Sequence, residues 1–205
     1  KLGSYIESYF PDVKVIYTRK DDVFVTLNRR ARIANEAKAD LFISIHCNYI
    51  RNRPDVLGSE TYVMGLHTAD HNLNVAMREN AAITHESDFQ KGYSGYDPDS
   101  PESHIMLSMF QNAYLERSIL FAELVEQQIP LASDGKHDSR GVRQAGFLVL
   151  KETAMPSVLV ESGYLSHEKD EAFLRTVEGQ KDVAFGIFKA FSIYKNVIEG
   201  NDEGE

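Results

Sequence analysis

Two short apolar runs each end in a titratable side chain, and they constrain the fold more than any other feature of the chain. Residues 41–47 read Leu-Phe-Ile-Ser-Ile-His-Cys, and residues 157–161 read Ser-Val-Leu-Val-Glu. Nearly continuous apolar runs of this length, between helical patterns and loops, are typical of buried parallel strands. We therefore predict an α/β fold: a single three-layer domain with a mostly parallel, twisted sheet and helices on both faces.

The remaining elements are predicted from local patterns. The chain opens inside a helical pattern, with Leu2, Ile6 and Phe10 at i, i+4 and i+8. Ser100-Pro101-Glu102 is a typical helix start, with a serine at the N-cap and proline at the first helical position. Further strands are predicted at 13–17, 58–63 and 147–150, and further helices from 26, over 73–83, from 100 to about 128 and around 184–191.

Residues 66–103 differ from the rest because they are polar and rich in turn-forming residues. We interpret them as an insertion, which contains the helix over 73–83, within one domain spanning residues 1–196. Residues 197–205 are strongly acidic, and we expect them to form a flexible, solvated tail.

Composition excludes several functional classes. The net charge is -9 and no basic stripe offsets it, so nucleic acid is not an expected partner. No apolar run approaches the roughly 18 residues that span a bilayer. Cys47 is the only cysteine, which excludes disulfide scaffolds and multi-cysteine zinc sites, and we expect its side chain to be small, apolar and buried.

The candidate chemistry lies at the ends of the two apolar runs. The carboxyl ends of parallel strands meet at one edge of a sheet, so His46 and Glu161 can converge on one cleft although they are far apart in sequence. A carboxylate placed there costs several kcal/mol unless it is paired, bound to metal or protonated. A structural salt bridge with an arginine is the alternative for Glu161, and a satisfied core histidine is the alternative for His46.

Other catalytic patterns are weak or absent from the sequence. There is no Gly-x-Ser-x-Gly turn, and Cys47 points to the opposite side of its strand from His46, so neither supplies a nucleophile and base pair. His67 and His71 have the i, i+4 spacing of helical zinc ligands, but the glutamate of the His-Glu-x-x-His pattern is missing between them. We expect both histidines to be solvated.

Four segments taken together resemble the zinc-dependent N-acetylmuramoyl-L-alanine amidases of bacterial cell walls. They occur in the same order along nearly the whole chain. The segments are Thr18-Arg-x-x-Asp-x-Phe-Val-x-Leu-x-x-Arg-x-x-x-Ala-Asn35, Ala39-Asp-Leu-Phe-Ile-Ser-Ile-His-Cys-Asn48, Gly58-Ser-Glu-Thr-Tyr62 and Met155-Pro-Ser-Val-Leu-Val-Glu-Ser-Gly-Tyr-Leu-Ser-His167.

The resemblance implies a zinc enzyme that cleaves the amide between N-acetylmuramic acid and L-alanine of the peptidoglycan stem peptide. It assigns His46 as a zinc ligand and Glu161 as the catalytic glutamate, with Asn48 and Glu60 in supporting roles. The family's other ligands, a histidine in a Gly-His-Gly-Gly turn and a glutamate on the following helix, do not occur in these residues, and we expect them upstream of Lys1. The alternative is a zinc-free homologue that binds peptidoglycan or a division partner without cutting it.

The resemblance also implies a regulatory role for residues 66–103. Division-associated members of the family carry an extra segment here that can cover the site and place an acidic side chain on the zinc until a partner protein displaces it. We expect a regulatory lid with Glu79 or Glu86 as the inhibitory ligand, and an activator protein acting on it; a surface loop that shapes the substrate groove is the alternative. Such an enzyme would be secreted and work in the periplasm or outside the cell.

Overall fold

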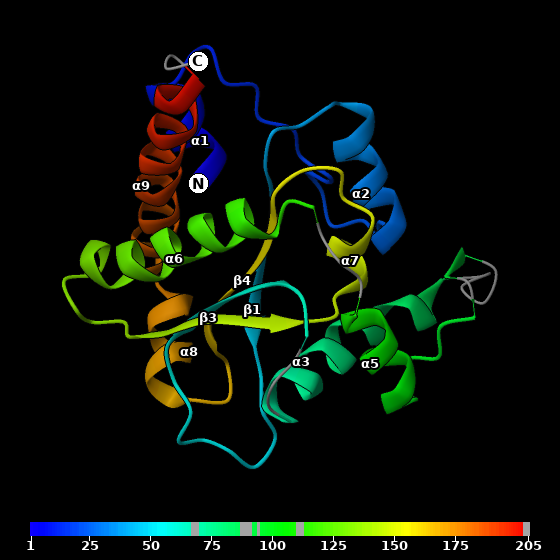
Figure 1. Ribbon diagram of the computed structural model, residues 1–205. Coiled ribbons are helices and arrows are strands. Elements are labelled where there is room, and N and C mark those ends of the chain that lie inside the picture. The colour runs from blue at the N-terminus through cyan, green and yellow to red at the C-terminus, as the bar shows by residue number, and fades with distance from the viewer. Residues whose placement is uncertain (67–69, 87–91, 94, 110–112, 203–205) are drawn as a thin grey trace.

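The computed structural model describes residues 1–66, 70–86, 92–93, 95–109 and 113–202, and for 201 and 202 the backbone only. Helices lie between most of the strands along the chain, although β1 and β2 follow each other directly (Figure 1). The elements are α1 Leu2–Tyr9, α2 Leu27–Glu36, β1 Phe42–Asn48, β2 Ser59–Met64, α3 Asp70–Asn80, η1 Ala81–His85, α5 Pro101–Ser108, α6 Leu115–Ala132, β3 Ser139–Ala145, α7 Leu148–Lys151, β4 Ser157–Tyr164, α8 Glu168–Arg175 and α9 Val177–Asp202.

The four strands described form one sheet in the order β1-β4-β2-β3. β1 pairs with β4 and β2 pairs with β3 in parallel, whereas β2 and β4 run antiparallel, so the sheet is mixed and mostly parallel. The β4 strand is buried along its whole length, which agrees with the apolar run Val158-Leu159-Val160 at its centre. This arrangement confirms the predicted α/β class.

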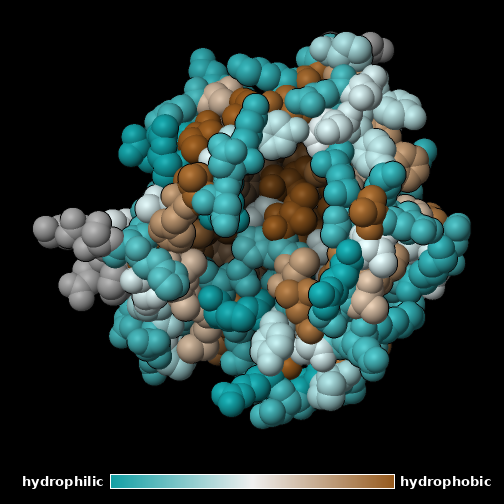
Figure 2. Space-filling view, turned by 180° about the vertical axis from the view of Figure 1, so that it is seen from behind, coloured by the Kyte–Doolittle hydropathy of each residue, from teal (hydrophilic) through white to brown (hydrophobic). Residues whose placement is uncertain are grey.

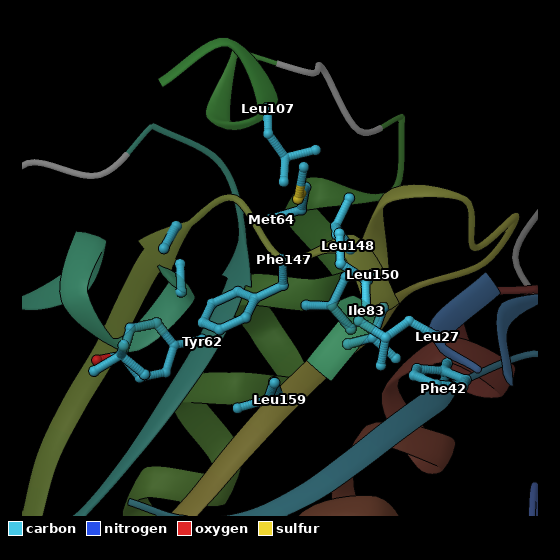
Figure 3. Packing of buried hydrophobic residues seen from close by; sticks show 14 of the residues in the cluster. Leu27, Phe42, Tyr62, Met64, Ile83, Leu107, Phe147, Leu148, Leu150 and Leu159 are labelled. Atoms are coloured by element: carbon cyan, nitrogen blue, oxygen red, sulfur yellow. The ribbon is translucent and has the colours of Figure 1, made fainter. Parts of the chain in front are cut away.

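Alternate residues of β4 pack into two separate cores. Leu159 belongs to a cluster with residues of α2, α3 and α7, whereas Val158 and Val160 pack with α6, α8 and α9. Helices therefore cover both faces of the sheet, with α6 crossing one of them (Figure 1). In the first cluster the rings of Tyr62 and Phe147 meet edge to face, with centroids 5.2 Å apart (Figure 3).

The strand predicted at 147–150 is wrong, because this run forms the short helix α7. All four side chains are buried, and a fully buried apolar run has no periodicity that separates a strand from a helical turn. The strand predicted at 13–17 is also absent from the sheet. Tyr17 there is 41% exposed, and alternation alone cannot form a strand without a neighbour to pair with.

Two helix boundaries differ from the prediction. The helix expected from 100 to about 128 is two helices, α5 and α6, although residues 109–114 contain neither glycine nor proline to mark a break. At the other end α9 continues to Asp202, so the predicted flexible tail is helical through that residue. Ile198 packs against the second core and Lys195 pairs with Glu199, which extends the helix beyond its predicted end.

The sheet is not covered equally on all sides. Seen from behind, the surface is hollowed in its middle, with hydrophobic residues at the bottom of the hollow (Figure 2). β1 is an edge strand, and its Ile45 is 49% exposed. Within the residues described, no helix is both long and apolar enough to cross a membrane.

Candidate active site

His46 on β1 and Glu161 on β4 lie opposite each other as Cα partners in the parallel pairing. Both side chains point to the face that carries Phe42 and Leu159, because residues an even number of positions apart in a strand share a face. The Glu161 side chain is fully buried and the His46 side chain is 27% exposed. The structure thus brings together the two residues that the sequence places at the ends of separate apolar strands.

The Glu161 carboxyl is incompletely compensated. Its Oε1 accepts a hydrogen bond from Arg78 Nη2 at 3.2 Å, but its buried Oε2 has no hydrogen-bond partner among the residues described. Burial raises the pKa of Glu161 to about 8; the charge of Glu79 adds to this rise and Arg78 opposes it. A carboxyl with such a pKa exchanges a proton readily near neutral pH, as a general base must.

Glu60 on β2 lies next to Glu161 in the antiparallel pairing and is also fully buried. Its Oε1 accepts hydrogen bonds from Tyr62 Oη at 2.9 Å, Asn48 Nδ2 at 3.2 Å and Tyr164 Oη, and lies 2.9 Å from His71 Nε2. Burial by itself would raise the pKa of Glu60, but the hydrogen bonds and the His71 charge lower it to about 2. Glu60 is therefore a fixed anion.

The side chains of His46, Glu161 and Glu60 form a row across β1, β4 and β2. Helix α3, from the predicted insertion, covers this row. Arg78 and Glu79 follow His71 by seven and eight residues, about two turns of the helix. All three side chains lie on the side of α3 that faces the sheet. His71 meets Glu60, Arg78 meets Glu161, and Glu79 Oε2 lies 2.7 Å from His46 Nδ1. Each polar residue of this face thus meets a side chain of the row with which it can pair.

Asn48 connects the sheet to α3. It donates to Glu60, and its Oδ1 accepts from Arg78 Nη1 at 2.9 Å and from the backbone N–H of Tyr49 at 2.8 Å. Arg78 Nη1 also donates to the carbonyl oxygen of Tyr49 at 2.5 Å. These contacts fix where Arg78 enters the site, which agrees with a supporting position for Asn48.

The helix is anchored from its other side by asparagine amides. Asn80 Nδ2 donates to the carbonyl oxygen of Gly146 at 2.8 Å, and its Oδ1 accepts from the backbone N–H of Leu148 at 2.9 Å. Val75 and Ala76 are buried in the first core. The position of α3 over the row is therefore set by packing and backbone contacts as well as by charge.

The structure separates the two acidic residues predicted as zinc ligands of a lid. Glu79 contacts His46, whereas Glu86 Oε1 accepts from the backbone N–H of Leu27 at 3.2 Å and from Tyr93 Oη at 2.8 Å. A carboxylate suits this place because the N-terminus of a helix has unpaired N–H groups. Glu86 therefore stabilises the start of α2 and does not contact His46.

Other expectations about single residues are corrected. His71 is not solvated, since it pairs with the buried Glu60, and Cys47 is exposed rather than buried. His137, a further residue of a type that can bind zinc, is buried beside Asp170, 3.5 Å from Nδ1 to Oδ1. His67 lies outside the described residues.

The donors around His46 fit zinc in kind but are too few for a complete site. An imidazole and a carboxylate, those of His46 and Glu79, are ordinary zinc ligands, but catalytic zinc sites usually use three protein ligands. Throughout the residues described, no three His, Cys, Asp or Glu side chains come together as a metal site.

Comparison with known proteins decides the family. Residues 1–192 match the family described as N-acetylmuramoyl-L-alanine amidase. The chain belongs to this family. It is 32% identical over 194 residues to N-acetylmuramoyl-L-alanine amidase AmiC of Escherichia coli O6:H1, covering 95% of this chain and 45% of that protein. It is 28% identical to AmiA of E. coli K12 over 86% of this chain and 59% of that protein.

Solved structures of the family share the fold. The catalytic domain of CwlV from Bacillus (Paenibacillus) polymyxa var. colistinus matches with a TM-score of 0.63 and 28% identity, covering 96% of this chain and 82% of that one. AmiC2 of Nostoc punctiforme matches with a TM-score of 0.64 and 27% identity, covering 95% and 81%. The chain spans about half the length of the E. coli relatives, 45% of AmiC and 59% of AmiA.

Sequence reasoning missed two arginines of the site. Arg78 stands directly before Glu79 and two turns after His71, so projecting the predicted helix onto one face would have suggested it. Arg140, whose Nε lies 3.3 Å from Glu60 Oε2, had no such signal, because β3 itself was not predicted.

Proposed function

We propose that this chain is the catalytic part of a zinc-dependent amidase that hydrolyses the bond between N-acetylmuramic acid and L-alanine in peptidoglycan. The observation that carries the proposal is the pairing of His46 with Glu161, whose buried Oε2 has no hydrogen-bond partner among the residues described. Membership of the amidase family supports the substrate. The proposal makes Glu161 the general base and His46 a zinc ligand.

The work assigned to the protein's own residues is proton transfer and alignment. Glu161 Oε2 takes a proton from the attacking water, and the same carboxyl then gives it to the leaving nitrogen of L-alanine. A raised pKa suits both steps, because the group must be able to hold the proton between them. Asn48 and Glu60 keep the neighbouring strand ends in place. Zinc, when bound at His46, would supply an activated water and polarise the carbonyl.

We further propose that α3 is an autoinhibitory lid. Glu79 lies against the zinc-binding His46 and Arg78 pairs with the base Glu161, so in this arrangement neither group can meet a substrate. A partner protein that binds residues 66–103 would draw α3 off the row and activate the enzyme. The action on peptidoglycan implies a location outside the cytoplasmic membrane, in the periplasm or beyond it, and a role in cell division.

A second candidate function is binding without catalysis. The observation in its favour is that no three potential zinc ligands come together within the described parts of the chain. Such a homologue would bind peptidoglycan or a division partner and would hold zinc weakly.

Hydrolysis of purified peptidoglycan with and without zinc separates the two functions. We expect activity that a chelator removes, that zinc restores, and that Glu161→Gln lowers at least about 1000-fold, as loss of a general base and its electrostatic role would. Glu126→Gln is the matched control: Glu126 is a buried glutamate that accepts from Ser59, Thr61 and Ser139 hydroxyls on the side of the sheet away from α3. Full activity in Glu161→Gln would reject the proposed mechanism.

Deletion of residues 66–103 tests the lid. We expect the deletion variant to hydrolyse peptidoglycan faster than the parent. An unchanged rate would favour the alternative that this segment only shapes the substrate groove.

A further inference from the structure

The row of polar side chains does not end at Glu60. β3 lies beyond β2 in the sheet, and it carries Arg140 and Arg143. Arg140 Nε lies 3.3 Å and Arg143 Nε 3.8 Å from Glu60 Oε2. The row therefore crosses all four strands, from His46 on β1 through the two buried glutamates to this arginine pair on β3.

A bulge in β3 brings the two arginines to the same side. Residues three apart in a regular strand point to opposite faces. Here the pairing with β2 shifts register, because Ser59 is opposite Ser139 but Thr61 is opposite Val142. Gly141, with φ +80°, supplies the backbone conformation of the extra residue, which a side chain would strain. The extra residue restores a common face, so both guanidinium groups reach Glu60.

The pair carries more positive charge than its surroundings neutralise. Glu60 is the only carboxylate that forms an ion pair with either arginine among the residues described, and the same Glu60 also accepts from Tyr62, Tyr164 and Asn48. The side chains of Arg140 and Arg143 are 31% and 38% exposed. The guanidinium carbon of Arg140 also lies over the Tyr164 ring, 5.6 Å from its centroid, a second contact that helps to hold this side chain in place. Two oriented, partly exposed guanidinium groups are a ready site for a carboxylate.

The distance from the catalytic glutamate suggests which carboxylate binds. From β4 through β2 to β3 is two strand spacings, about 10 Å. Both guanidinium groups reach back towards Glu60 on β2, so they lie between one and two strand spacings from Glu161, about 5–10 Å. An extended peptide advances about 3.3–3.6 Å per residue, so a chain whose first residue lies at Glu161 comes within reach of the arginines at its second or third residue. We propose that Arg140 and Arg143 form a subsite that binds a free carboxylate on the second or third residue of the stem peptide. This inference rests on the proposed amidase function, which places the first residue at Glu161.

In the arrangement described here the same subsite is covered from one side. His71 of α3 lies 2.9 Å from Glu60, the carboxylate with which both arginines pair. The lid would then block recognition of the stem peptide at one end of α3 and chemistry at the other. Binding experiments are therefore done in the Arg78→Gln and Glu79→Gln double variant, which removes the contacts of α3 with Glu161 and His46 and so weakens its hold on the row.

The test compares two muramoyl tripeptides, one with free carboxylates on its second and third residues and one with both converted to carboxamides. Affinities are measured by calorimetry with a chelator present, in the Arg78→Gln and Glu79→Gln background, so that nothing is hydrolysed. We expect the acid form to bind about tenfold more tightly or better, the effect of a charge-assisted hydrogen bond. In Arg143→Gln this preference should fall towards one.

Arg32→Gln is the matched control, since Arg32 is an exposed arginine on α2 that pairs with Glu36; it should keep the full preference.

A second matched pair of variants tests the bulge. Gly141 and Gly135 both have positive φ and open surroundings, so Gly141→Ala should reduce the preference while Gly135→Ala should not. These glycine variants leave both arginines in the sequence and so test the geometry rather than the charge.

Equal binding of the two tripeptides, or a preference that survives Arg143→Gln, would overturn the subsite and leave the amidase proposal standing. Preferential binding of the acid form by a protein that does not hydrolyse peptidoglycan with zinc would keep the subsite and overturn the amidase. Failure to bind either tripeptide would overturn the subsite, while zinc-dependent hydrolysis of peptidoglycan would still decide the amidase proposal separately.

Discussion

Glu60 and Glu161 are equally buried neighbours on adjacent strands, but their pKa values are shifted in opposite directions. They are Cα partners between β2 and β4, and neither side chain is accessible to solvent. The pKa of Glu60 is lowered to about 2, against burial, and that of Glu161 is raised to about 8 by burial and by the charge of Glu79. Burial alone therefore does not decide the ionisation of either group.

The difference lies in the number of donors that each carboxyl meets. Glu60 is surrounded by two tyrosine hydroxyls, an asparagine amide, a histidine and two arginines, whereas Glu161 has Arg78 and one unpaired oxygen among the residues described. A buried carboxylate with enough hydrogen-bond donors and positive charges stabilises the structure. A buried carboxyl without them readily binds a proton or a new partner. The contrast thus separates a structural anion, Glu60, from the carboxyl that we propose as the general base, Glu161.

The largest expected effect is on stability at Glu60. Glu60→Gln should lower the free energy of unfolding at pH 7 by about 3 kcal/mol, because it leaves the buried donors without their anion and places an amide against Arg140. Urea unfolding of the zinc-free protein measures it. The exposed Glu123→Gln on α6 should change stability by less than about 0.5 kcal/mol. A loss below about 1 kcal/mol would mean that the Glu60 network is not closed in solution.

The same variant gives a prediction about pH. The pKa of Glu60 is lower in the folded protein, about 2, than its ordinary value of 4.5. Its stabilising contribution is therefore complete above about pH 4.5 and is lost as the pH falls towards 2. The difference in unfolding free energy between the parent and Glu60→Gln should shrink across this window. A difference that is constant from pH 6 to pH 3 would contradict the assignment of Glu60 as the fixed anion.

Glu161→Gln should show the mirror image, with a smaller effect. Because the folded pKa of about 8 is above the ordinary 4.5, the folded parent binds more protons than the unfolded chain and loses stability as the pH rises between these values. A neutral amide escapes this loss. In a chelator, the variant should be more stable than the parent by about 1 kcal/mol at pH 7, and by more at pH 9. Destabilisation at both pH values would show that Glu161 is a structural ion pair, the alternative reading of its sequence.

How far the sequence could predict these two residues depends on whether the signal is local. The strand that contains Glu161 is visible because the three residues before Glu161 are apolar, and Thr26 and Ser100 cap α2 and α5 as their types predict. The role of Glu60 depends on donors from three other strands and from α3, which no local pattern contains. For the same reason His71 looked solvated, since only the fold brings it to Glu60.

The smallest expected effect is the coupling energy between Arg78 and Glu161, which tests whether α3 lies on the row in solution. Arg78 is 34% exposed, so water screens its pairing with Glu161, and a double-mutant cycle between Arg78→Gln and Glu161→Gln should give a coupling of about 0.5–1 kcal/mol. Each single variant also changes hydrogen bonds that the other does not share, such as that of Arg78 with Asn48. The cycle subtracts these separate effects and leaves the energy of the contact between Arg78 and Glu161. Hydrogen exchange supplies the independent readout: the α3 amides should exchange faster in Arg78→Gln, and those of β4 should not. A coupling of zero with unchanged exchange would mean that α3 does not compensate Glu161 either, which would deepen the contrast with Glu60 and contradict the proposal that α3 covers the base.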